Sequence, residues 1–559
     1  MSHPGCHAAI LSRWRDGRPI VARPQVGFGS RVELVNQVYF WMAGFAALIA
    51  GVLLVKNEKI KPRIVDALLI LATIYVGIHL YQALDIGKVS KSSITPVIDA
   101  DKAELSLKMA QALESTSHVF FSPKIIDRRP QSINLPVPNA PQTAEKQIEA
   151  LKRESQRILG GVVQRNPTAG IMEAKYALVT HDLGDPNSVS IERLSHIDTP
   201  NAHKLHKALF LLYGSGRPKP TPDEVAEAEE TFKTILPRGW YRDTALVDLY
   251  KKTGNKAELE KLQAQMDETG LRLISKLVVV GCVMLVSFLV GIIVILVQLF
   301  FLPRTVTNEE QRALIASPFP FGFRTIYGVF MAWMVTQVLL SSLLQSGVKI
   351  SELMNKGVLL AACTTAVLYL ASNGPGILYI YLIAVKPHGL KFLDTVKMRA
   401  RVGKLGPGRL VLAGWLTWFA AVPVVLTCYL IALKFMNSQG SSNPVIALVM
   451  EAARSADIPS ILMFYFTLGV LAPICEETLF RGFLYTSFRK YWGVFPSLLL
   501  SSLLFAGVHM DAGGFLPLFG LGFLFGFIVE RTKSILPSMV AHGLWNSGTF
   551  TLVLLLFGN

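Results

Sequence analysis

Long uncharged hydrophobic runs alternate with short polar segments over most of the chain. The run "LVVVGCVMLVSFLVGIIVILVQLFFL" at 277–302 is longer than the ~20 residues that span a bilayer as a helix. Continuous apolar runs of this length predict helices, because the backbone must satisfy its own hydrogen bonds in lipid. The sequence therefore predicts an all-α, polytopic transmembrane bundle of about ten spans. The predicted spans are 35–55, 65–85, 275–302, 325–346, 357–386, 409–434, 459–484, 496–509, 515–530 and 535–557.

The fifth predicted span contains "SNGPG" at 372–376, which either kinks it or splits it in two. If it is one span, the basic segments of the chain all fall on one side of the membrane, which the positive-inside pattern assigns to the cytoplasm. A split would invert everything upstream of it. These basic segments are 56–64, 386–409, 489–490 and 531–533.

A polar segment at 86–272 separates the second and third spans, and on this topology it projects away from the cytoplasm. It starts with a proline-rich linker and continues with apolar residues at helical spacing, which predicts an inserted soluble α-helical domain. "TALVDLYKKTGNKAELEKLQAQM" at 244–266 resembles one tetratricopeptide unit, although a plain helical hairpin explains it equally well. We expect this domain to bind a protein partner or to position the membrane part. The predicted organisation is a basic N-terminal arm (1–34), a transmembrane hairpin (35–85), the soluble domain (86–272), a span and loop (273–324) and a membrane domain (325–559).

Composition agrees with a membrane protein, since 51% of the residues are hydrophobic and only 17% are charged, against about a quarter in soluble domains. The formal net charge of +16 does not indicate nucleic-acid binding, because the positive residues gather at the ends of hydrophobic runs. The five cysteines have no paired spacing, so neither a disulfide framework nor a thiolate metal site is expected. The arginine-rich N-terminus is not a secretory signal; an organellar transit piece, a disordered arm and a misassigned start remain open. A bacterial plasma membrane is the expected location, with a plastid membrane as the alternative.

The predicted span "LGVLAPICEETLFRGFLYTSF" at 468–488 carries three ionisable groups, Glu476, Glu477 and Arg481. Each costs roughly 2.5–3.5 kcal/mol at mid-bilayer unless it is paired or faces a wet cavity. Glu477 and Arg481 are four residues apart on one helix face and can form an ion pair. Glu476 lies about 100° away around the helix and has no local partner. A purely structural ion cluster is the alternative, but Glu476 favours a functional site.

Two later spans supply further polar groups. His509 ends an apolar run four residues after Phe505, and His542 and Asn546 lie four residues apart on one helix face. A single membrane histidine more often packs than reacts. One unpaired glutamate, two histidines and an amide on three helices, however, suffice to activate water and to stabilise an oxyanion.

These residues resemble three motifs of the CPBP family, the CAAX-protease and bacteriocin-processing (Abi-type) membrane proteases, which include the Ras-converting CAAX prenyl endopeptidase. "EETLFR" at 476–481 resembles EExxxR, "FAGVH" at 505–509 resembles FxxxH, and "HGLWN" at 542–546 resembles HxxxN. The resemblance covers about 325–557. It implies that Glu476 and His509 activate a water, that His542 and Asn546 stabilise the oxyanion, and that Glu477, Arg481 and Phe505 support the site.

The resemblance implies an intramembrane endopeptidase of glutamic type that works without a cofactor on a membrane protein or peptide in the lipid bilayer. Zinc held by Glu476, His509 and His542 is the chemical alternative, although no HExxH is present. A non-proteolytic scaffold or an immunity-type protein is the alternative from another functional class. A proton-coupled transporter is disfavoured, because no inverted repeat is evident. No prenyl-binding groove can be recognised, so the substrate stays open.

Overall fold

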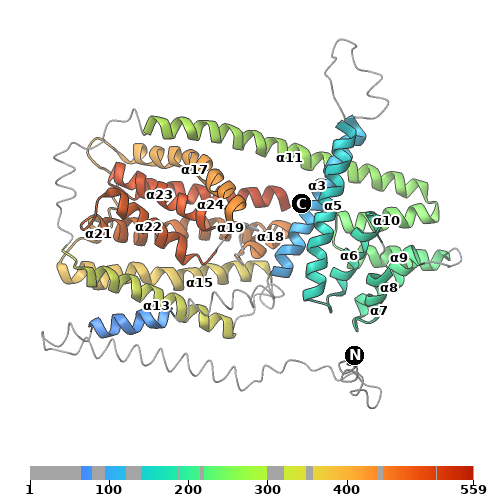
Figure 1. Ribbon diagram of the computed structural model, residues 1–559, viewed down its shortest axis with the longest axis horizontal. Helices are drawn as coiled ribbons and strands as arrows, with labels where there is room; N and C mark the ends of the chain where they lie inside the picture. The colour runs from blue at the N-terminus through green and yellow to red at the C-terminus, as the bar shows by residue number, and fades with distance from the viewer. Residues whose placement is uncertain are drawn as a thin grey trace, which may run out of the picture.

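The computed structural model describes residues 65–77, 95–120, 140–185, 188–214, 220–298, 320–347, 357–436, 445–511 and 513–557 (Figure 1). Within these ranges every secondary-structure element is a helix, and a single isolated β-bridge joins Val402 to Leu405. The predicted all-α class is therefore confirmed.

Seven short and medium helices form the helical domain, drawn at the right of Figure 1. They are α3 (Thr95–Phe120), α5 (Ala140–Arg165), α6 (Gly170–Asp182), α7 (Ser188–Ser195), α8 (Pro200–Tyr213), α9 (Pro222–Ile235) and α10 (Trp240–Thr253). Their starts follow the usual capping chemistry: Thr221 and Glu224 form a reciprocal capping box at α9. One hydrophobic core, with Leu107, Phe232 and Trp240 buried in it, extends through this domain.

Helix α11 (Lys256–Leu296) joins the helical domain to the membrane helices without a break. Gly254 adopts a left-handed conformation between α10 and Asn255, which caps α11, so a tight turn joins these two helices. The second helix continues for 41 residues through the predicted boundary at 272–273. Figure 1 shows α11 leaving the domain and running along α17.

Two glycines bring α11 very close to its neighbours. A Cβ at Gly270 would collide with Ser115 of α3, and a Cβ at Gly291 would collide with the backbone carbonyl of Phe419 in α17. Small residues at such crossings let helix backbones approach closely. The helix is therefore held at one point by the domain and at another by the bundle.

The membrane bundle is built from helices of the C-terminal half. They are α13 (Phe323–Gly347), α15 (Val358–Tyr379) with the π-helix η2 (Ile380–Val385), α17 (Pro407–Met436), α18 (Val445–Ser455), α19 (Ile458–Phe466), η4 (Thr467–Leu471), α20 (Ala472–Glu477), η5 (Thr478–Tyr485), α21 (Thr486–Phe488), α22 (Val494–Val508), α23 (Phe515–Thr532) and α24 (Leu536–Phe557). The 3₁₀ turn η3 (Lys386–His388) and the short α16 (Phe392–Thr395) connect η2 to α17.

Seven of the described helical segments are long and apolar enough to cross a membrane. They are Lys256–Leu296, Phe323–Leu340, Val358–His388, Pro407–Lys434, Ile458–Phe488, Phe515–Thr532 and Leu536–Leu556. Two shorter apolar helices, Val65–Gly77 and Val494–Val508, fall on two further predicted spans. The predicted span at 35–55 lies outside the described residues. Pro375, in the "SNGPG" segment, lies inside one continuous helix, so the fifth span is not split.

The helical domain contacts the end of the bundle formed by α18 and the last turn of α24. Arg454 of α18 donates to Asp101 of α3 at 2.6 Å, and Leu105 of α3 packs against Met450 and Ala453. Helix α18, which follows the predicted span 409–434, and the inserted domain therefore lie at the same end of the bundle. This agrees with a topology in which the fifth span is undivided.

Asp243 in α10 gives the helical domain a pH dependence, because burial raises the pKa of its carboxyl from 3.8 to about 6. Between these two pH values the folded state binds more protons than the unfolded state, so stability falls as pH rises. Asp243→Asn should therefore stabilise α10 by roughly 1–3 kcal/mol at pH 7.5 and leave it unchanged at pH 3.5. Hydrogen–deuterium exchange of α10, compared with the wild type at each pH, measures this. Equal protection of both proteins at pH 7.5 would contradict it.

Candidate active site

The membrane span that carries the two glutamates is not a regular α-helix. It changes from α19 to the π-helical η4, to the short α20, to the π-helical η5 and back to α21. Glu476 and Glu477 close α20, directly before η5 begins. π-Helical turns inside α-helices occur frequently at functional sites, because they change which side chains share a face.

Glu477 and Arg481 form the predicted ion pair at the centre of the bundle. Arg481 Nη1 donates to Glu477 Oε1 at 2.8 Å, and the two side chains are 1% and 0% exposed. Arg481 also donates to the carbonyl of Gly522 in α23 at 3.2 Å, and its guanidinium lies 4.1 Å from the ring centre of Phe505 in α22. The pair therefore links the span of the two glutamates to both neighbouring helices.

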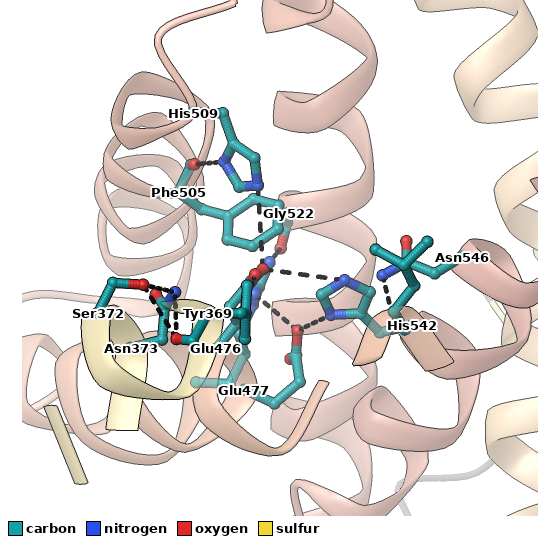
Figure 2. A network of polar contacts seen from close by, with 12 residues as sticks. Tyr369, Ser372, Asn373, Glu476, Glu477, Phe505, His509, Gly522, His542 and Asn546 are labelled. Carbon is teal, nitrogen blue, oxygen red and sulfur yellow. Dashed lines mark hydrogen bonds and ion pairs between the residues drawn. The ribbon is translucent and has the colours of Figure 1, made fainter. Parts of the chain in front are cut away.

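His542 of α24 lies between the two glutamates (Figure 2). Its Nδ1 lies 2.9 Å from Glu477 Oε1, and its Nε2 lies 3.8 Å from Glu476 Oε2. An ionised carboxylate can only accept, so Nδ1 is the donor in the first contact. Glu477 thereby fixes the ring with Nε2 directed towards Glu476.

His509 approaches Glu476 from the end of α22. Its Nδ1 donates to the carbonyl of Phe505 at 2.6 Å, which leaves Nε2 3.9 Å from Glu476 Oε2. Glu476 Oε2 is buried and accepts no hydrogen bond from the described residues. Distances of 3.8 and 3.9 Å to two imidazole nitrogens are too long for direct hydrogen bonds, but a bridging water spans such gaps.

Tyr369 of α15 is a member of the site that the sequence analysis missed. Its hydroxyl donates to Glu476 Oε1 at 2.6 Å, so the two oxygens of Glu476 have different surroundings. Ser372 and Asn373 both donate to the carbonyl of Tyr369, as Figure 2 shows. The first two residues of "SNGPG" thus hold the backbone of Tyr369. Their polar side chains in an apolar span were the sequence signal that could have pointed to Tyr369.

Asn546 is held one helical turn beyond His542. Its Nδ2 donates to the carbonyl of Leu468 in η4 at 2.9 Å. In the described part of the chain it shares no hydrogen bond with either glutamate. The structure thus brings Glu476, His509 and His542 together, while Asn546 stands beside them with its second amide hydrogen available.

The same three side chains are the ligands of the zinc site that the sequence leaves as the chemical alternative. Among the described residues, no group of three His, Cys, Asp or Glu side chains is placed to hold a metal ion. Glu476, His509 and His542 come from three different helices and do not form such a group in this arrangement.

The segment that carries this site is similar to a known family and to several bacterial proteins. Residues 458–548 match the family described as "Type II CAAX prenyl endopeptidase Rce1-like". The chain is 29% identical over 173 residues to an uncharacterized 24.3 kDa protein of Escherichia coli, covering 30% of this chain and 73% of that protein. It is 30% identical over 125 residues to the "Putative membrane peptidase YdiL" of Bacillus subtilis, covering 21% of this chain and 50% of that protein.

A third relative, the UPF0177 protein YaiF of Lactococcus lactis, is 28% identical over 122 residues, which cover 21% of this chain and 54% of that protein. No solved structure matches the chain with comparable significance. The predicted resemblance to CPBP-type membrane proteases is thus confirmed, and the family match falls on the segment that carries all three motifs. The chain spans only about half the length of the Bacillus and Lactococcus relatives.

Removing the cation of the buried pair should destabilise the protein strongly. Arg481→Leu leaves Glu477 buried without its ion-pair partner, for which we expect a loss of about 3–5 kcal/mol. Unfolding of the detergent-solubilised protein by titration with SDS measures this loss. The exposed pair of Arg324 and Asp66, 2.7 Å apart, supplies the control, since Arg324→Leu should cost less than about 1 kcal/mol. Equal losses in the two variants would contradict the expectation.

Proposed function

We propose that the protein is an intramembrane endopeptidase that hydrolyses a peptide bond of a membrane-associated protein or peptide. One observation carries this proposal: Glu476 Oε2 is a buried carboxylate oxygen that accepts no hydrogen bond from any residue the structure describes, and two imidazole Nε2 atoms lie 3.8 and 3.9 Å away. The match to an endopeptidase family over 458–548 supports it. So does the relative from Bacillus subtilis that is described as a membrane peptidase.

The attacking water would lie between Glu476 and His509. One of its hydrogens would point to Glu476 Oε2 and the other to the unprotonated Nε2 of His509, which directs an oxygen lone pair at the substrate carbonyl. Glu476 would accept a proton as the oxygen–carbon bond forms. It would return this proton to the amine as the carbon–nitrogen bond breaks. The proton that Glu476 takes from the water is the one that it gives to the amine, so the reaction balances without a cofactor. We therefore propose metal-free hydrolysis.

The oxyanion would be stabilised by His542 and Asn546. When His542 is protonated, Glu477 balances its charge at Nδ1 and its Nε2–H is a donor facing the site. Asn546 would add its free amide hydrogen, which brings no further charge into the bilayer. Glu477 and Arg481 would act by positioning, because Glu477 Oε1 holds both Arg481 and His542 and the guanidinium of Arg481 contacts two further helices.

Replacing the proposed base tests the function directly. Glu476→Gln preserves the shape of the side chain but cannot accept the proton, so turnover should fall by about 10²–10⁴-fold. The measurement is a comparison of new protein N-termini in membranes from cells with wild-type or variant protein, in which a precursor should accumulate in the variant. Glu451→Gln in α18 is the control and should process normally.

The outcome also separates the competing chemistries. Unchanged processing by the Glu476→Gln variant would overturn the protease proposal and favour a scaffold. Once a cleaved substrate is known, activity should survive treatment with EDTA in a sample shown by elemental analysis to be free of zinc. Activity that disappears with EDTA and returns with zinc would replace the metal-free mechanism.

Tyr369→Phe tests the residue that orients Glu476. Loss of a hydrogen bond to a charged group should reduce turnover by about 10–100-fold while the protein folds normally. Processing of the accumulated precursor by purified variant and wild-type protein measures the effect. Tyr379→Phe is a matched control on α15, because it removes a hydroxyl that contacts Thr336 at 2.9 Å outside the site. Equal activity of the two variants would remove Tyr369 from the site.

A further inference from the structure

A cavity of about 650 Å³ lies in the helical domain, bounded mainly by α3, α10 and α11. It is separate from the membrane helices that carry Glu476 and Glu477, and the proposed peptidase chemistry does not use it. Its size falls within the range of small-molecule sites. The charges of its lining indicate which ligand it would recognise.

The cavity is strongly basic. Seven lysine or arginine side chains line it, against two carboxylates. Four of the seven are paired with acids within 4 Å. Among the described residues the other three, Arg238, Arg242 and Lys276, have no ion-pair partner. The lining thus keeps an excess of positive charge that its own acids do not neutralise.

Two of these cations, the half-buried Arg242 and the exposed Arg238, are four residues apart in the sequence and both line the cavity. Arg242 uses Nε and Nη2 to donate to the carbonyl of Leu236, at 3.0 and 2.6 Å, which fixes the plane of its guanidinium. Burial, and then the nearby charge of Arg238, lowers the pKa of Arg242. Like charges held together in this way favour a multivalent anion, and arginine suits phosphate geometry in particular.

The N-terminus of α10 adds a second feature of an anion site. Gly239, which caps this helix of 14 residues, offers no side-chain hydrogen bond to the free backbone N–H groups of the first turn. Gly239 and Trp240 both line the cavity. This helix start has no side-chain cap. The two arginines beside it outnumber the one carboxylate of its first turn, Asp243, so it presents donors and net positive potential to an anion.

The cavity also reaches the level at which the bilayer begins. Lys276 is the last charged residue of α11, and the 20 residues that follow it to Leu296 carry no charge. Leu556 lines the cavity too, and it is the last residue of the membrane span Leu536–Leu556. A ligand bound here can keep its apolar part in the membrane.

We propose that this cavity binds a phosphate group, and that the headgroup of an anionic phospholipid supplies it. Arg238, Arg242 and the first turn of α10 contact the phosphate, and Lys276 contacts it from the membrane side. The acyl chains leave past Leu273 and Leu556 into the bilayer. The site ties the helical domain to the lipid surface at one defined position.

Lipid titration of the full-length chain tests this proposal. Native mass spectrometry of the detergent-solubilised protein should detect tighter binding of phosphatidylglycerol than of phosphatidylcholine. The double variant Arg238→Gln with Lys276→Gln should bind phosphatidylglycerol about 30-fold more weakly. Each basic residue near an anionic lipid surface strengthens binding by a similar factor, and the variant removes two of them. Lys251→Gln with Lys256→Gln removes the same charge from positions outside the cavity and should bind like the wild type.

Two further results decide the source of the phosphate. Hydrogen–deuterium exchange should show protection of the first turn of α10 by phosphatidylglycerol. Protection by millimolar inorganic phosphate alone, with none from the lipid, would assign the same site to a soluble phosphate compound and overturn the lipid source. Absence of protection by both, or equal weakening in the two double variants, would overturn the site itself.

Discussion

The buried ion pair of Glu477 and Arg481 is the interaction on which the membrane part depends. Two charges removed from both water and the lipid headgroups are stable only when each is satisfied by good geometry. Here the guanidinium reaches α22 and α23, while the carboxylate holds the imidazole of α24. Four segments of the bundle are thus fixed relative to this one ion pair. Glu476, the residue next to Glu477, is thereby held in a defined position although it is not part of the pair.

The sequence was sufficient to predict those parts of this core that depend on residues close together in the chain. The spacing of Glu477 and Arg481 on one helical turn was sufficient to predict their pairing, and the leftover charge of Glu476 marked it as different. Charge-free runs were sufficient to locate the spans. His509 and His542 could be recognised as candidates because polar groups are expensive in lipid, and the structure does bring them to Glu476.

Other features depend on contacts between distant parts of the chain. Tyr369 lies 107 residues before Glu476, and nothing in its own neighbourhood says which carboxylate its hydroxyl meets. The π-helical turns around α20 have no reliable sequence signature, so the shared face of Glu476 could not be derived from a regular helix. The uninterrupted α11 was missed as well, because polar and apolar halves of one helix look like two elements.

That uninterrupted helix has a consequence for how the gene can change. Between Gly270 and Gly291, where α3 and α17 grip it, α11 rises by about 30 Å and turns by 100° for each residue. Adding or removing a single residue there would rotate the helical domain about the helix axis and separate both crossings. Loops elsewhere tolerate length changes, whereas the number of residues in this interval sets both the distance and the rotation between the two crossings. Homologous chains with the same two-part architecture should therefore keep the number of residues between the two crossings constant.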